Sequence, residues 1–192
     1  PVHLYGHMAY MDEILEVAKK KNIKIIEDAS QSLGSKFKGK HSGTFSHLGC
    51  FSLYGGKIIT SGEGGAIVTD DKKLLEKLRQ IRNHGLAKNN LTITLGLNLR
   101  LSEINAAIAK IQMKKLPRLL NERKKNAQIL TDLLKNYDAI LPKQRKNETV
   151  NWYLYTVALK NRDKIMKKLN ASGIGARIYY SPSIHKMPYY KT

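Results

Sequence analysis

The stretch Gly49-Cys50-Phe51-Ser52-Leu53-Tyr54-Gly55-Gly56-Lys57 decides the fold of this chain. It starts as a short apolar segment, typical of a buried strand, and ends in two glycines and a lysine. Ser52 and Lys57 are five residues apart, so a hydroxyl and an amine stand close to the strand end. The glycines allow a bulky group to approach the backbone. Taken alone, Lys57 is also consistent with an exposed turn lysine.

The segments on either side of this stretch predict an α/β unit. Met11 to Lys21 has the apolar spacing of an amphipathic helix, and Ile23 to Asp28 follows as a strand that ends in two acids. Gly62 to Gly65 is a glycine-rich turn, and Ala66 to Thr69 is a further strand. Helices that alternate with buried strands are typical of a mostly parallel sheet.

The rest of the chain predicts more helix and then a small α+β unit. Asp70 and Asp71 can cap a helix that runs to about Arg82, and Ser102 can cap a long helical region. We expect Pro117 to interrupt that region. The remaining expected elements are a polar connection from Gly34 to Phe45, a strand from Trp152 to Leu159, a helix from Asp163 to Asn170 and a strand from Arg177 to Tyr180.

Asp28 is a candidate ligand-binding residue because of its place in the chain. It stands at the carboxyl end of an expected strand, where open α/β sheets bind ligands. A carboxylate there can pair with a protonated ring nitrogen. A surface acid or a helix cap would explain a lone aspartate equally well.

Taken together and in order, several motifs resemble one family. The chain is similar to the DegT/DnrJ/StrS family of pyridoxal-phosphate (PLP)-dependent sugar-nucleotide aminotransferases. The resemblance covers almost the whole chain, and the ordered set is far more specific than any single motif. The matching stretches are Pro1–Gly6, Glu27–Ser32, Gly49–Lys57, Gly62–Thr69, Arg82–Gly85, Gly96–Ser102 and the region of His185, Pro188 and Tyr189.

The resemblance implies a role for five residues. Lys57 matches the lysine that binds the cofactor covalently, and Asp28 matches the acid that pairs with the pyridine nitrogen. Gln31 matches the glutamine beside the phenolic oxygen of the cofactor, and Ser52 matches a ligand of its phosphate. Asn98 matches a residue that reaches the phosphate in the neighbouring subunit, which implies a homodimer.

The resemblance also implies a fold and a reaction. The fold is that of aspartate aminotransferase, with residues 1–115 in the large PLP-binding domain and 116–192 in a connecting helix and small C-terminal domain. The reaction transfers an amino group, with glutamate as the usual donor, to a keto nucleotide-sugar in the synthesis of surface polysaccharide. Arg177 and His185 are candidate substrate-binding residues. Because the upstream strands of such a domain are missing, we expect the chain to be a fragment.

Two alternatives stay open, one from composition and one from the missing upstream strands. The formal net charge of +19 suits anionic partners, including nucleic acid, but no aromatic residues interleave the basic ones as in single-strand-binding grooves. An inactive remnant that pairs with a partner chain is the other alternative. The single cysteine favours a reducing, cytoplasmic location, and the sequence contains neither a signal peptide nor an apolar run that could span a membrane.

Overall fold

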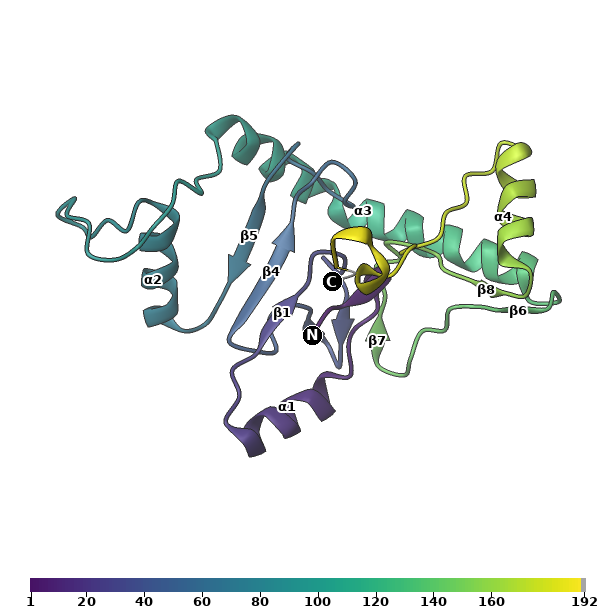
Figure 1. Cartoon of the computed structure of the whole chain (residues 1–192), viewed down its shortest axis with the longest axis horizontal. Helices are drawn as coiled ribbons and strands as arrows, with labels where there is room; N and C mark the ends of the chain where they lie inside the picture. The colour runs from purple at the N-terminus through teal and green to yellow at the C-terminus, as the bar shows by residue number, and fades with distance from the viewer. Residues whose placement is uncertain (191–192) are drawn as a thin grey trace.

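The computed structural model describes residues 1–190, and its central sheet contains the candidate site. The strand order is β1 (Ile26–Asp28), β4 (Leu48–Ser52) and β5 (Gly65–Val68). β1 and β4 run parallel, and Val2 forms a parallel bridge with Asp28, but β4 and β5 run antiparallel. The expected α/β arrangement is therefore confirmed in part, because the sheet is mixed (Figure 1).

Two helices begin and end as the sequence predicts. α1 spans Met11–Lys21 and ends at Asn22, whose left-handed backbone (φ 52°) closes the last turn. α2 spans Lys72–Arg82, and the Asp71 carboxylate caps it by accepting hydrogen bonds from the first free backbone N–H groups. These helices lie at opposite ends of the central sheet (Figure 1).

Pro117 does not interrupt the long helix, so that prediction was wrong. α3 runs without a break from Glu103 to Leu134, and the Ser102 hydroxyl caps its start. A proline inside a helix removes one backbone hydrogen bond. The helix continues through this position, and Leu120, in the turn after Pro117, lies close against Gly34. α3 also crosses position 115, so the predicted division at 115 and 116 stays a prediction.

A second small sheet joins distant parts of the chain. The expected connection from Gly34 to Phe45 contains a hairpin of β2 (Lys36–Phe37) and β3 (Lys40–His41), which sequence reasoning missed. β7 (Glu148–Thr149) pairs with the other edge of β2. The sheet therefore anchors the C-terminal third of the chain beside the central sheet.

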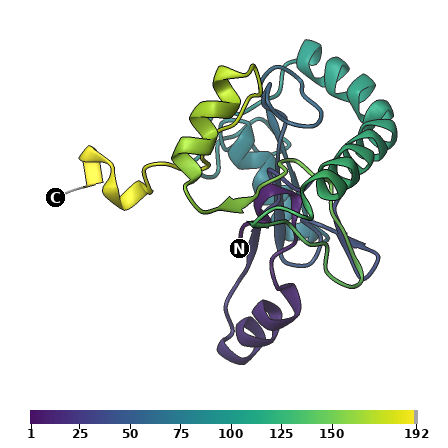
Figure 2. The ribbon, with the colours of Figure 1, turned by 90° about the vertical axis from the view of Figure 1, so that its right-hand side faces the viewer.

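The C-terminal part contains less strand than predicted. β6 (Ala139–Ile140) pairs with β8 (Ala158–Leu159), so only the end of the expected strand from Trp152 forms. α4 (Arg162–Ala171) confirms the predicted helix. The 3-10 helices are η1 (Leu4–Gly6), η2 (Ile184–Lys186) and η3 (Pro188–Tyr190). η2 and η3 lie in the yellow C-terminal tail of Figure 2.

The predicted strand from Arg177 to Tyr180 is wrong. This segment forms no strand pairing, and the Tyr179 carbonyl, which a neighbouring strand would use, accepts from the Tyr5 hydroxyl instead. The Tyr180 hydroxyl also accepts from Gln31. Across residues 1–190, no helix is both long enough and apolar enough to cross a membrane.

Candidate active site

Lys57 lies in the loop that follows β4, with a half-buried side chain. Its backbone N–H donates to the Tyr54 carbonyl at 3.0 Å, which closes a tight turn over the two glycines. The loop is fixed at its base, because Leu53 donates to the Gly64 carbonyl and accepts from the Ser61 N–H. The turn therefore holds the root of the lysine side chain in one place at the end of the sheet.

Two opposing effects act on the Lys57 amine. Burial lowers its pKa, because the charged form is desolvated, and the nearby Asp28 carboxylate raises it. Burial is the larger effect, so the pKa lies below its usual value. A lysine in this state loses its proton more readily than a surface lysine, as an amine nucleophile or base requires.

Asp28 ends β1 beside this loop, where parallel pairing with Cys50 places it next to β4. One oxygen of its carboxylate, Oδ1, accepts a hydrogen bond from the Ser30 N–H at 3.0 Å and another from the Ser30 hydroxyl. Oδ2 has no hydrogen-bond partner within the described residues. The side chain is exposed, so this oxygen is free to accept from a ring N–H.

Gln31 is buried, and its amide is held at both ends. Its Oε1 accepts from the Tyr5 N–H at 2.8 Å, and its Nε2 donates to the Tyr180 hydroxyl at 3.0 Å. Tyr5 in turn donates its hydroxyl to the Tyr179 carbonyl at 2.6 Å. These contacts close the C-terminal segment over the loop that follows β1.

Tyrosines form walls of this site that sequence reasoning missed. Tyr5, Tyr179 and Tyr180 surround Gln31, and the ring of Tyr153 lies 5.0 Å from the Lys57 Nζ. The available signal was the tyrosine pair at 179 and 180, two residues after the candidate Arg177. Its meaning depends on contacts with residues more than a hundred positions away.

The chemistry of the site residues fits PLP. The amine, the free carboxylate oxygen and the amide come from neighbouring segments, and Ser52 stands half-buried at the end of β4. A Cβ at Gly55 would meet only the Gly62 carbonyl at 3.9 Å, so open space lies beside the turn. The Ser52 hydroxyl accepts a weak bond from the Tyr54 N–H at 3.3 Å and can donate to a phosphate.

Three predicted residues lie outside this cluster. Asn98 is exposed, pairs with Asn83 beyond α2, and accepts from Arg100 at 3.0 Å. Arg177 and His185 are exposed in the C-terminal segment, and neither makes a hydrogen bond or ion pair with the cluster within residues 1–190. The structure therefore brings together Lys57, Asp28, Gln31 and Ser52 but not the other three.

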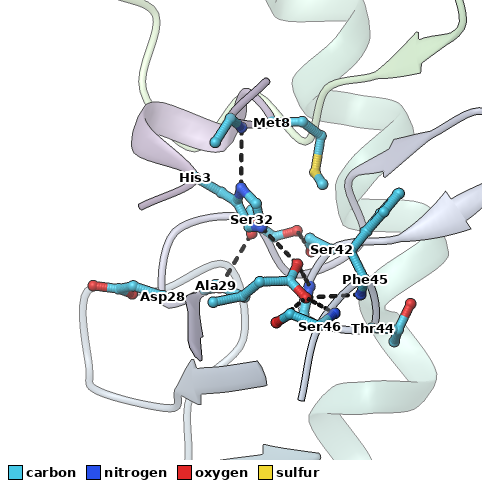
Figure 3. A network of polar contacts seen from close by, with 12 residues as sticks. His3, Met8, Asp28, Ala29, Ser32, Ser42, Thr44, Phe45 and Ser46 are labelled. Atoms are coloured by element: carbon cyan, nitrogen blue, oxygen red, sulfur yellow. Dashed lines mark hydrogen bonds and ion pairs between the residues drawn. The ribbon is translucent and has the colours of Figure 1, made fainter. Parts of the chain in front are cut away.

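A buried network beneath the site fixes β1 (Figure 3). The Glu27 carboxylate accepts hydrogen bonds from the backbone N–H groups of residues 43, 45 and 46, from the Ser46 hydroxyl and from His3 at 2.8 Å. The Ala9 N–H donates to His3 Nδ1, so His3 Nε2 carries the proton given to Glu27. Burial alone would raise the Glu27 pKa, but these bonds lower it.

Comparison with known proteins identifies the family. Residues 1–192 match the DegT/DnrJ/EryC1/StrS aminotransferase family from end to end. The chain belongs to this family. The match confirms the family named from the motifs and makes the cluster around Lys57 its candidate active site.

Individual members of the aminotransferase family agree with this assignment. The dTDP-3-amino-3,4,6-trideoxy-alpha-D-glucose transaminase of Streptomyces venezuelae is 36% identical over 99% of this chain and 51% of its own length. The GDP-perosamine synthase of Caulobacter vibrioides is 37% identical, over 99% and 53%. The chain therefore spans about half the length of the curated relatives it matches.

Solved structures of family members share the fold. A DegT/DnrJ/EryC1/StrS aminotransferase from Brucella abortus superposes with a TM-score of 0.95 at 32% identity, over 100% of this chain and 52% of its own. DesV of S. venezuelae, solved in complex with a ketimine intermediate, has a TM-score of 0.94 at 36% identity, over 100% and 52%. The large domain of the family fold is thus present only in part.

Proposed function

We propose that the whole protein is a PLP-dependent aminotransferase that aminates a keto nucleotide-sugar, with glutamate as the amino donor. The observation that carries this proposal is the convergence of Lys57, Asp28 and Gln31 at one end of the central sheet. Family membership and the names of the relatives support the reaction and substrate class. Synthesis of amino sugars for surface polysaccharide in the cytoplasm is the setting we infer.

Each residue of the cluster has a task in this proposal. Lys57 would hold the cofactor through its amine, and its free amine would move a proton to and from the donor's α-carbon. Asp28 would accept from the ring nitrogen and keep it protonated. Gln31 would offer its amide to the phenolic oxygen, and Ser52 would donate to the phosphate. Bound PLP supplies an electron sink for charge that develops at the α-carbon.

We further propose that the site is completed by a second copy of the chain. Asn98 lies in a segment beyond α2, and its side chain contacts Arg100 rather than the cluster around Lys57. This separation supports a role for Asn98 at the phosphate of a neighbouring subunit. Arg177 and His185 remain proposed substrate-binding residues, since both are exposed and carry groups that can bind anionic oxygens.

The test is cofactor uptake by the full-length protein. We expect a visible absorbance band on addition of PLP, which Lys57→Ala abolishes and the surface control Lys77→Ala retains. Asp28→Asn is expected to keep the band but to lower the transamination rate by roughly 10²–10³, the usual cost of losing one such electrostatic partner. A full-length protein that never takes up PLP would contradict the proposal.

A further inference from the structure

We propose that Tyr153 is a positioning residue for Lys57, whose ring face holds the protonated amine at the site. This inference rests on the proposed function, because it assigns Tyr153 to the lysine that attaches the cofactor. The Lys57 Nζ lies 5.0 Å from the centroid of the Tyr153 ring, within the range of a cation–π contact. Within residues 1–190 the amine has neither a hydrogen bond nor an ion pair, so the Tyr153 ring is its direct contact, while the Asp28 carboxylate attracts it from farther away.

The backbone of Tyr153 is fixed by two other elements. Its N–H donates to Asn151 Oδ1 at 2.9 Å, and its carbonyl accepts from Arg123 of α3 at 3.2 Å. Asn151 is only 1% exposed, and its Nδ2 donates to the carbonyls of Gln31 and Leu33 at 2.9 and 3.0 Å. Asn151 thus joins the loop that carries Gln31 to the segment that carries Tyr153.

The packing leaves Asn151 little freedom to move. A Cβ on Gly6 would lie 2.0 Å from Asn151 Oδ1, so only glycine permits this approach. Gly6 directly follows Tyr5, whose N–H holds the other side of Gln31. The ring over Lys57 and the amide of Gln31 are therefore set by one rigid, buried arrangement.

This arrangement gives the ring a chemical task. A lysine released from its cofactor carries a proton for part of each cycle and would otherwise extend into water. The negative face of the ring attracts the ammonium form and not the neutral amine. Tyr153 thus keeps the proton-carrying amine beside the reacting atoms and releases it on deprotonation.

The experiment measures the pKa of Lys57 directly, without cofactor. Competitive acetylation of the full protein over a range of pH, read residue by residue by mass spectrometry, gives the fraction of neutral amine, with exposed Lys72 as the internal reference. We expect Tyr153→Leu, which keeps a bulky apolar side chain at this half-buried position, to raise that fraction about three- to thirty-fold at a fixed pH. Tyr153→Phe keeps the ring and is expected to change it less than two-fold.

The sign of the change separates positioning from packing. A purely structural role would expose Lys57 to water when Tyr153 is replaced, and the neutral fraction would then fall. Fluorinated phenylalanines at position 153 provide a second test that preserves shape. Each added fluorine weakens the negative potential of the ring face and should raise the fraction of neutral Lys57 amine. No change across that series, or equal behaviour of the leucine and phenylalanine variants, would overturn the proposal. PLP uptake is scored separately, so failure of the proposed function is distinguishable.

Discussion

At the scale of single residues, the Glu27 carboxylate fixes several segments around the site, although it does not line the site itself. It is fully buried and accepts bonds from the N-terminal segment through His3 and from the loop that leads into β4. It also precedes Asp28 in the chain, so the same network sets where that side chain leaves the sheet. A buried carboxylate is stable only when such donors replace water.

We predict that Glu27→Gln destabilises the protein by about 2–4 kcal/mol, because the new NH₂ group would face backbone N–H donors and leave buried groups unpaired. Urea unfolding at neutral pH measures the loss. The exposed α1 residue Glu13 supplies the control, since Glu13→Gln is expected to change stability by less than about 0.5 kcal/mol. Equal stability of the two variants would count against this account of the network.

The cluster itself was predictable in part. The motifs and the spacing of three residues predicted a cofactor-binding lysine at the end of a strand. The structure places Lys57, Asp28 and Ser52 at that end of the sheet. The tyrosine walls could not be predicted in this way. Tyr5 and Tyr179 are 174 positions apart, and nothing local in the sequence specifies that contact.

At the scale of elements, α3 is held against the sheet region by a close approach at one glycine. Gly34 has a φ of +88°, and a Cβ there would lie 2.6 Å from Leu120 Cδ1. Gly39 has a similar φ of +79° but nothing within 4 Å of a Cβ. A substitution at either glycine would therefore strain the backbone to a similar extent. Only at Gly34 would it also clash with a neighbouring side chain.

We predict that Gly39→Ala costs about 1 kcal/mol from backbone strain, whereas Gly34→Ala costs a further ~1–3 kcal/mol because it overpacks the contact with α3. Chemical denaturation of both variants measures the difference. Combining Gly34→Ala with Leu120→Ala should recover part of the extra loss relative to the sum of the single variants. Equal costs at the two glycines would show that α3 does not constrain this loop.

The elements that sequence reasoning missed have one cause in common. α1 and α2 were predicted because their caps and apolar faces are local, as with Asn22 and Asp71. The pairing of β2 with β7 joins segments more than a hundred residues apart, and α3 continues through Pro117 against the local preference of proline. Local propensity therefore gave way to tertiary contacts at these places.

At the scale of the whole molecule, Glu148 joins the N-terminal segment to β7. Its buried carboxylate accepts from the Met8 N–H at 2.6 Å and from Arg145 at 3.1 and 3.2 Å, and His7 lies 3.6 Å away. Arg145 also donates to the Met8 carbonyl. The N-terminal segment that carries Tyr5 is thus tied to the strand that leads to Asn151 and Tyr153, and the Leu154 N–H donates to the Tyr5 carbonyl at 3.3 Å.

These contacts make stability depend on pH. Burial alone would raise the Glu148 pKa, but the bonds from His7, Arg145 and the Met8 backbone outweigh it and lower the pKa from 4.5 to about 2. The folded state then holds this carboxylate ionised where the unfolded chain protonates it. The stabilisation is full above the ordinary pKa near 4.5 and is lost as the pH falls through about 2.

We predict that Glu148→Gln lowers stability at pH 7 by roughly 3 kcal/mol, the free energy that such a difference in pKa represents. The gap between wild type and variant should narrow as the pH falls from about 4.5 toward 2, because the wild-type carboxylate then becomes protonated. Urea unfolding at a series of pH values measures both curves, with the exposed Glu76→Gln as control. A gap that stays constant down to pH 2 would mean that the charge of Glu148 does not hold the N-terminal segment against β7.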